Sequence, residues 1–426
     1  MRHSRSPSPE TIPLLRTRLS RSAALRALAL SALLLAGFGC KSDSTATTAA
    51  GTTGAASTTG GVTAATATQD TTGDTIKIGE YASLTGPNAT FGVETDNGVK
   101  LAIKEINAKG GVLGRKIELE TEDDQSKTEE AKTVATKFAS DPKIAAVIGE
   151  VASTRSLAAA PVFQRAGIPM VSPSSTNEKV TKEGDYIFRV CYIDNFQGMV
   201  MAKFAANGLH VKKVAMLREQ TSDYSVGLCD VFKDEFTKAG GQIVADVSFK
   251  TADNDFRSQL SQMKDADAIF VPSYYDSVGT IARQARVLGI TAPLLGCDGW
   301  DSPILVEGAG GPGKALEGSY FSNHYSKDDK KPIVQNYVKA YATEYGGKAP
   351  SGLSALGYDA MKILALAMET AKSTDRAKVK DALAQTKNFP GVTGNITIDA
   401  NRNANKPAVV LQIKGSAFVY KQTVNP

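Results

Sequence analysis

Hydroxyl side chains gather at two places where an apolar run of the chain ends. Residues 145–156 read AAVIGEVASTRS, and Ser153 opens their hydroxyl-rich end. Residues 168–178 read IPMVSPSSTNE and include Ser174 and Thr176. Ser and Thr commonly cap a helix start by accepting from its free backbone N–H groups. Because a helix start also attracts anions, the two clusters predict caps that double as donors for a bound anion.

Further polar residues follow other apolar runs in the same way. Tyr274 and Tyr275 come after AIFVPS, and Asp298 comes after PLLGC. In open α/β sheets, ligands bind beyond the carboxyl ends of the strands. We therefore expect two half-sites that face each other.

The elements that would position these residues alternate between β-rich runs and amphipathic stretches. The first unit has predicted strands at 75–84, 116–124, 144–151 and 168–174, and predicted helices at 95–111, 127–141 and 154–167. The second has predicted strands at 212–219, 241–249, 268–275 and 292–300, and predicted helices at 225–241, 255–266 and 277–289. A strong helix is predicted at 354–372. Such alternation favours an α/β protein with parallel sheets covered by helices on both faces.

Motifs for catalysis or phosphate binding are weak. Residues 308–314, GAGGPGK, meet a G-x-G-x-x-G pattern, but the run before them is helix-compatible and Ala315 replaces the expected Ser or Thr, which favours a surface turn. The three His residues lie far apart, which argues against a metal site, and we interpret His324 as structural. With no G-x-S-x-G elbow and no acid–base cluster, we expect no enzyme and no cofactor.

Charge and cysteine content narrow the function classes. The chain has 426 residues and a net charge of +5, but residues 1–40 contain six Arg and one Glu, so the remainder balances 43 basic against 43 acidic residues. No basic nucleic-acid surface is expected. Cys191, Cys229 and Cys297 are an odd set with no metal-ligand spacing, and we expect small buried side chains.

The N-terminal segment has the pattern of an export signal. Arginines precede the apolar run ALALSALLLAGFG, which is short for a membrane span, and Cys40 follows it. Residues 1–39 resemble a lipoprotein signal peptide with Cys40 as the lipidated residue, although Gly37 stands where lipoproteins usually have Leu. A plain secretory signal and an uncleaved anchor remain alternatives. Residues 40–74 then form the predicted tether, because they lack apolar periodicity.

The order of several phrases resembles the branched-chain (Leu/Ile/Val) amino-acid-binding protein family, the type I periplasmic solute-binding component of an ABC transporter. The resemblance covers nearly all of residues 75–426 and is carried by SLTGPNATFG, AIKEINAKGGVLGRKIEL, VIGEVASTRS, PMVSPSSTNEKVT, DYSVGLCDVF, IARQARVLGI and PLLGCDGWDSP. It implies two Rossmann-like lobes joined by a three-crossover hinge, with a ligand cleft between them. Lobe 1 would comprise 75–193 plus 324–400, and lobe 2 would comprise 194–323 plus 401–426. The family's early disulfide is missing, since Ser126 and Ala152 occupy its positions.

The resemblance also implies a role for individual residues. Ser153 and Thr176 match hydroxyls that hold the ligand carboxylate, and Ser174 matches a residue whose main chain contacts the ligand. Tyr274 and Asp298 match residues near the ligand ammonium. Asp replaces the Glu of many relatives, so its carboxylate reaches one methylene less far.

The remaining predicted site residues are aromatic. Tyr224 matches the residue that closes over the ligand, and Phe91 matches one that lines the side-chain pocket. Tyr81 and Trp300 are further pocket residues, proposed from their closeness in sequence to strand ends.

The implied function is capture of an amino acid for ABC permease subunits by a monomer outside the cytoplasm, held to the membrane by a lipid. A sensory role on the same fold remains open, and a neighbouring histidine-kinase gene would favour it. Amides, short-chain acids and aromatic compounds remain alternative ligands, because the predicted aromatic residues suit several side chains.

Overall fold

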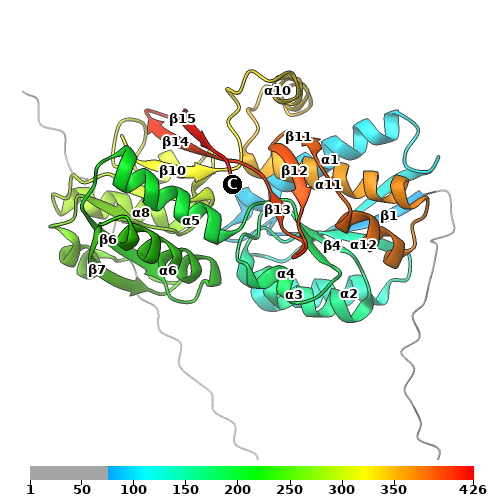
Figure 1. Cartoon of the computed structure of the whole chain (residues 1–426), viewed down its shortest axis with the longest axis horizontal. Helices are drawn as coiled ribbons and strands as arrows, with labels where there is room; N and C mark the ends of the chain where they lie inside the picture. The colour runs from blue at the N-terminus through cyan, green and yellow to red at the C-terminus, as the bar shows by residue number, and fades with distance from the viewer. Residues whose placement is uncertain (1–74) are drawn as a thin grey trace, which may run out of the picture. The chain divides into compact units, whose positions relative to one another are not determined.

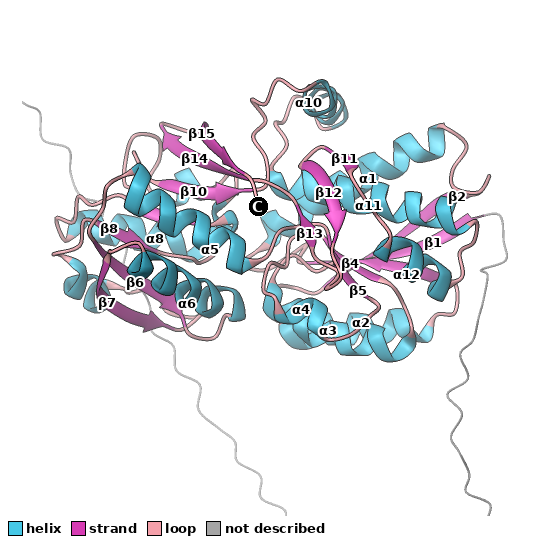
Figure 2. Ribbon diagram, in the orientation of Figure 1, coloured by secondary structure: helices cyan, strands magenta, loops and turns pink. Residues whose placement is uncertain are grey.

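The computed structural model describes residues 75–426, so the predicted signal peptide, Cys40 and the predicted tether lie outside the described residues. Two open sheets with helices on both faces lie side by side, as Figure 1 and Figure 2 show. We call the part built on the first sheet lobe 1 and the part built on the second sheet lobe 2. The predicted two-lobed α/β class is confirmed.

Lobe 1 contains a five-stranded parallel sheet in the order β2-β1-β3-β4-β5. Its strands are β1 (Thr75–Ala82), β2 (Lys116–Asp123), β3 (Ile144–Ile148), β4 (Met170–Ser172) and β5 (Ile187–Arg189). Its helices are α1 (Ala89–Ala108), α2 (Thr128–Ser140), α3 (Ser153–Ala166), α4 (Lys179–Lys182), α10 (Pro332–Glu344), α11 (Gly352–Ala371) and α12 (Arg376–Ala384). β3 is buried on both faces: Ala146 and Ile148 join one apolar cluster, and Val147 joins another. A near-continuous apolar run is what a central parallel strand requires.

Lobe 2 contains a seven-stranded sheet in the order β15-β14-β10-β9-β8-β6-β7. Its strands are β6 (Lys213–Glu219), β7 (Gln242–Phe249), β8 (Ala268–Phe270), β9 (Leu294–Gly296), β10 (Tyr320–Asn323), β14 (Ala408–Lys414) and β15 (Ala417–Val424). Its helices are α5 (Asp194–Lys203), the π-helical η1 (Phe204–Gly208), α6 (Asp223–Lys238), α7 (Arg257–Leu260), α8 (Tyr275–Val287) and α9 (Leu305–Gly308), with 3₁₀ turns η2 (Ser261–Met263) and η3 (Asp298–Trp300). β14 and β15 pair antiparallel, unlike the rest.

The chain passes between the lobes three times, at residues 190–193, 324–331 and 406–407. A small third sheet, made of β11 (Phe389–Gly391), β12 (Gly394–Ile398) and β13 (Ala404–Asn405), precedes the last passage. Because Ala404 pairs with Ile398, the last passage comes after residue 405, several residues later than the predicted boundary at 400.

Some predicted elements differ from the observed ones. α1 begins at Ala89, six residues before the predicted start, because Gly92 in its first turn interrupts the apolar pattern. That glycine is required by packing, since a Cβ there would lie 2.1 Å from the Ser83 carbonyl oxygen. The helix predicted over 255–266 is broken into α7 and η2. Gly308 ends α9, and residues 309–314 form turns and bends after it, in agreement with the predicted surface turn.

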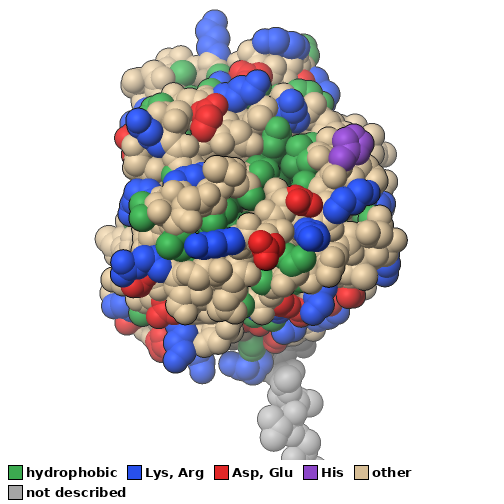
Figure 3. All heavy atoms as spheres, turned by 90° about the vertical axis from the view of Figure 1, so that its left-hand side faces the viewer, with side chains coloured by type: hydrophobic (Ala, Val, Ile, Leu, Met, Phe, Trp, Pro, Cys, Tyr) green, Lys and Arg blue, Asp and Glu red, His purple; other side chains and the backbone are tan. Residues whose placement is uncertain are grey.

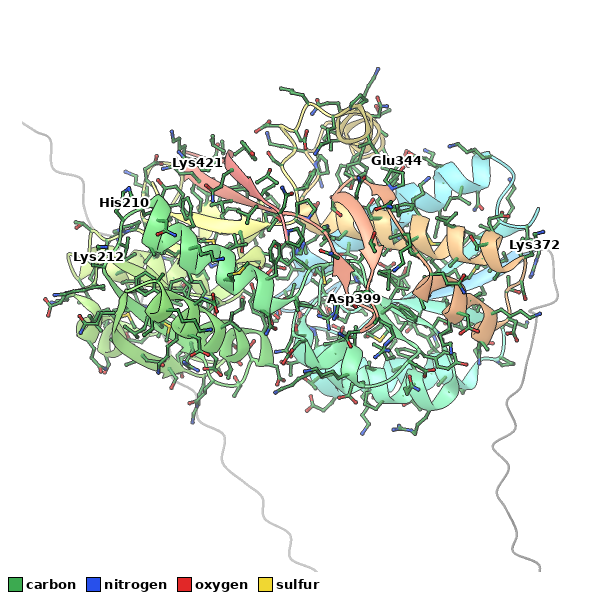
Figure 4. All side chains as sticks on the ribbon, in the orientation of Figure 1. His210, Lys212, Glu344, Lys372, Asp399 and Lys421 are labelled. Atoms are coloured by element: carbon green, nitrogen blue, oxygen red, sulfur yellow. The ribbon has the colours of Figure 1, made fainter. Side chains whose placement is uncertain are left out.

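The surface and the thiols agree with the sequence. Lys/Arg and Asp/Glu side chains are both spread over the face in Figure 3, so no single sign of charge dominates it. Charged residues such as Lys212, Lys372 and Lys421 lie exposed at the periphery (Figure 4). The three described cysteines are free and buried, as predicted. No helix within residues 75–426 is long and apolar enough to cross a membrane.

Candidate ligand-binding site

The two hydroxyl clusters form adjoining loops at the carboxyl ends of β3 and β4. Ser153 and Thr176 are buried, with exposed fractions of 1% and 0%. The Ser153 hydroxyl accepts from the backbone N–H of Asn177 at 3.1 Å, and the Ser174 hydroxyl donates to the Val151 carbonyl at 3.3 Å. The Thr176 hydroxyl has no hydrogen-bond partner among the described residues. The structure therefore brings the three predicted carboxylate-binding residues together.

The predicted capping role of these hydroxyls is wrong. The N-cap residue of α3 is Ala152 and that of α4 is Glu178, and neither makes a side-chain cap bond. The hydroxyls instead join the two loops, because those of Ser172 and Ser175 donate to the Glu150 carbonyl at 2.7 and 2.8 Å. The sequence pattern therefore predicts the position of the two loops correctly. The hydroxyl hydrogen bonds, however, connect one loop to the other and do not cap a helix.

A buried arginine fixes the loop that carries Thr176. Arg189 at the end of β5 is 0% exposed, and its guanidinium donates to the Ser175 carbonyl and, at 2.7 Å, to the Asn177 carbonyl. These carbonyls flank Thr176 on both sides. The two hydrogen bonds therefore fix the backbone on both sides of Thr176 and so restrict the position of its hydroxyl.

Lobe 2 contributes a polar and aromatic half. Tyr274 is the N-cap residue of α8, Asp298 opens η3 after β9, and Tyr224 lies in the first turn of α6. The Tyr224 hydroxyl donates to Asp298 Oδ1 at 2.9 Å and accepts from the Gly299 N–H at 3.0 Å. The rings of Tyr224 and Tyr274 stack with centroids 5.0 Å apart. Three predicted lobe 2 residues thus form one unit.

The two halves meet in a closed arrangement. Phe91 of α1 packs edge-on against Tyr274, with centroids 5.6 Å apart, so the aromatic surface crosses from one lobe to the other. The Asp223 backbone N–H donates to the Thr154 hydroxyl at 3.1 Å, and Asn177 Nδ2 donates to the Asp223 carbonyl at 2.8 Å. The hydroxyl loops of lobe 1 therefore lie directly against the start of α6.

Two predicted pocket residues lie elsewhere. Tyr81 is fully buried in the core of lobe 1, where its hydroxyl donates to Met170 Sδ at 3.4 Å and its ring packs on Phe163. Trp300 is fully buried in lobe 2, and its Nε1–H donates to the Val271 carbonyl at 3.0 Å. Neither aromatic ring stacks on Phe91, Tyr224 or Tyr274 among the described residues, so both are better interpreted as core residues.

His324 was interpreted as structural, yet it contacts the predicted ammonium-binding acid. Its Nε2 lies 3.0 Å from Asp298 Oδ2, and its ring stacks on Tyr192 with centroids 3.9 Å apart. Burial lowers the pKa of His324 to about 4, so the imidazole is neutral at pH 7 and donates Nε2–H to Asp298. Asp298 is consequently oriented by both Tyr224 and His324.

A second buried acid was missed altogether. Asp194 begins α5 directly after the first passage between the lobes, and its backbone N–H donates to the Thr176 carbonyl at 2.9 Å. Its Oδ1 accepts from Gln197 Nε2 at 3.0 Å. The sequence around Asp194, CYIDNFQG, does not indicate that this acid is buried next to Thr176, because Thr176 comes from a distant part of the sequence.

The chain belongs to the periplasmic binding protein family, whose model matches residues 75–417. It is similar to the leucine-binding protein LivK of Thermotoga maritima, at 40% identity and a TM-score of 0.78 over 82% of this chain and 99% of that one. It is also similar to LivJ of Streptococcus pneumoniae, solved in complex with isoleucine, at 35% identity and a TM-score of 0.78 over 83% and 100% of the chains.

A curated relative and a more distant structure widen the range of ligands. The leucine-, isoleucine-, valine-, threonine-, and alanine-binding protein of Pseudomonas aeruginosa is 30% identical over 76% of this chain and 86% of its own. A solute-binding protein of Rhodopseudomonas palustris, solved with 3,4-dihydroxybenzoic acid, is 26% identical, with a TM-score of 0.74 over 83% and 98% of the chains. Proteins similar to this chain therefore include amino-acid binders and a protein solved with an aromatic acid.

Proposed function

We propose that this protein captures an amino acid, most readily leucine, isoleucine or valine, between its lobes and delivers it to ABC permease subunits. The observation that carries the proposal is that the loops with the buried hydroxyls of Ser153 and Thr176 contact the start of α6, which carries the Tyr224–Asp298 hydrogen bond. Hydroxyl and N–H donors suit a carboxylate, and a buried acid suits an ammonium group. The names of the similar leucine- and isoleucine-binding proteins support the choice of ligand.

Calorimetry with L-leucine, L-isoleucine and L-valine tests the proposal. We expect Asp298→Asn to weaken binding by about tenfold or more, because a charge-assisted hydrogen bond becomes a neutral one. Asp230→Asn removes an exposed acid of the same lobe and should leave the dissociation constant unchanged. An Asp298→Asn variant that binds as tightly as the parent protein would contradict the ammonium role, and no binding of any of the three would contradict the ligand class.

A second ligand class has support of its own. The dihydroxybenzoate-binding neighbour shares this fold, and the rings of Phe91, Tyr224 and Tyr274 could stack on an aromatic ligand. Thermal-shift measurements with 3,4-dihydroxybenzoate and with isoleucine separate the two classes, since a tight ligand raises the melting temperature by mass action.

We further propose that the protein works as a monomer outside the cytoplasm, tethered to a membrane through a lipid on Cys40. The apolar segment that ends at this cysteine and the flexible composition of residues 41–74 support the tether. Mass spectrometry of the mature N-terminus should find an acylated Cys40. A free terminus at another residue would contradict the anchor without touching the binding function.

A further inference from the structure

Asp194 has an unused acceptor inside the site. It is 2% exposed, and its Oδ1 is occupied by Gln197, but its Oδ2 has no hydrogen-bond partner among the described residues. A buried acceptor without a partner costs free energy, so a group that supplies a donor would be bound favourably there.

The surroundings of Asp194 Oδ2 are those of the ligand site. The Thr176 hydroxyl lies close enough to the Asp194 carboxylate to lower its pKa, although neither this hydroxyl nor Asp194 Oδ2 makes a well-formed hydrogen bond among the described residues. On the other side lies α6, where a Cβ at Gly227 would stand 3.8 Å from Asp194 Oδ2, one helical turn after Tyr224. Gln197 connects the two acids, because its Oε1 accepts from the Asp298 backbone N–H at 3.5 Å while its Nε2 donates to Asp194.

The charges near Asp194 are not balanced by an ion pair. Asp298 is its acidic neighbour on η3, and the neutral His324 adds no positive charge. Arg189 on β5 is the nearest cation, but its guanidinium is bound to backbone carbonyls. The other titratable groups that interact with the two acids are Tyr192, Tyr224, Tyr274, Asp301, Cys191 and Cys297.

We propose that Asp194 is a second acceptor for the ligand ammonium, which it shares with Asp298. This inference rests on the amino-acid ligand of the proposed function and names the feature that the ligand must have. An ammonium group has three N–H donors, and Asp194 Oδ2, the Asp298 carboxylate and the Thr176 hydroxyl supply three acceptors. Ligands without an ammonium, such as benzoates and short-chain acids, would leave two buried acids facing each other.

The shared ammonium predicts that binding releases protons. Burial, followed by the charge of Asp298, raises the pKa of Asp194 to about 7, although the polar side chains of Thr176 and Gln197 partly offset this. Roughly half of Asp194 therefore carries a proton at pH 7 in this closed, ligand-free arrangement. An adjacent ammonium lowers that pKa, so each ligand bound should displace roughly half a proton.

The test is calorimetry at pH 7 in two buffers with different ionisation enthalpies, using whichever of the twenty L-amino acids binds most tightly. We expect the parent protein to release roughly half a proton per ligand and Asp194→Asn to release much less, with about tenfold weaker binding. Asp124→Asn is the matched control, because Asp124 is buried with a pKa raised to about 7 but pairs with Arg155 in lobe 1. It should keep both the proton release and the affinity.

The outcomes separate this inference from the proposed function. A parent protein that binds an amino acid without releasing protons overturns the role of Asp194, even if Asp194→Asn fails to fold, and leaves the proposed function intact. Tight binding of a non-branched amino acid with proton release supports the inference and corrects the proposed ligand. Binding of only 3,4-dihydroxybenzoate, or of no amino acid at all, overturns both.

Discussion

At the scale of single residues, Arg189 stabilises the loop that carries Thr176 and is not itself a predicted ligand-binding residue. Its guanidinium bridges two carbonyls on either side of Thr176, a geometry that the single ammonium of lysine cannot reproduce. We expect Arg189→Lys to lower the free energy of unfolding by about 2–3 kcal/mol, because at least one buried hydrogen bond to a charged group is lost. Urea unfolding measures this loss.

The matched control at this scale is Arg218→Lys in lobe 2. Arg218 binds Asp246 through two bonds of 2.8 Å, but this pair lies near the surface and should contribute about 1 kcal/mol or less. Equal losses in the two variants would contradict a special role for Arg189. Weaker amino-acid binding by Arg189→Lys alone would agree with a loop that positions Thr176.

The site could be predicted only where its signal is local. Ser153, Thr176 and Asp298 follow apolar strands directly, so strand-end position alone marked them as candidates. Asp194 and His324 become functional candidates only through Thr176 and Asp298, which lie 18 and 26 residues away in sequence. Tyr81 and Trp300 failed for the opposite reason, since closeness to a strand end does not fix which way a side chain points.

At the scale of elements, α1 and α11 pack through glycines. A Cβ on Gly98 would stand 1.9 Å from the Ser354 carbonyl oxygen, and one on Gly357 would stand 2.5 Å from the Thr95 carbonyl oxygen. We expect Gly98→Ala to force the helices apart and lower the free energy of unfolding by about 2–4 kcal/mol, despite the better helix propensity of alanine. Gly308→Ala in α9 is the control, because a Cβ there would stand 4.0 Å from the Cα of Gly279, an ordinary van der Waals distance. A stabilised Gly98→Ala protein would contradict this packing.

Local patterns also explain which elements were found in the sequence. The alternating strands and helices of each lobe were predicted because each βα unit completes its own pattern within a short stretch. β14 was missed: its run AVVLQIK is almost entirely apolar, and its partner β10 lies about 90 residues upstream. A short apolar run of this kind fits either a strand or a buried helix until its partner is known.

At the scale of the whole described unit, the lobes are joined by contacts that depend on the closed arrangement. The Thr154–Asp223 and Asn177–Asp223 bonds place the start of α6 on the hydroxyl loops, and Tyr275 reaches across to the Pro87 carbonyl at 2.8 Å. Three chain passages also connect the lobes, which is the arrangement expected for hinge closure. A ligand that bridges Thr176 and Asp298 would favour this state over an open one.

The buried acids make the stability of the closed structure depend on pH. Burial raises the pKa of Asp124 and Asp194 to about 7 and that of Asp276 and Asp301 to about 6. Between pH 5.5 and 7.5 these carboxyls lose protons in the folded state, whereas in the unfolded state they are already ionised, so rising pH removes stability. His324 acts in the opposite direction. Its pKa in the folded protein is lowered to about 4, so at pH 5.5 the unfolded chain binds a proton that the folded protein does not. This difference destabilises the fold at pH 5.5 and disappears as the pH rises to 7.5.

Four raised acids outweigh one histidine, so the ligand-free protein should be more stable at pH 5.5 than at pH 7.5, by on the order of 4 kcal/mol. Thermal unfolding across this range measures the difference as a fall in Tm with rising pH. Asp194→Asn and Asp124→Asn should each flatten the profile, because each removes one of the groups that must ionise inside the protein. A Tm that rises from pH 5.5 to 7.5 would contradict the buried, uncompensated state of these acids, and with it the negative environment into which the ligand ammonium is proposed to bind.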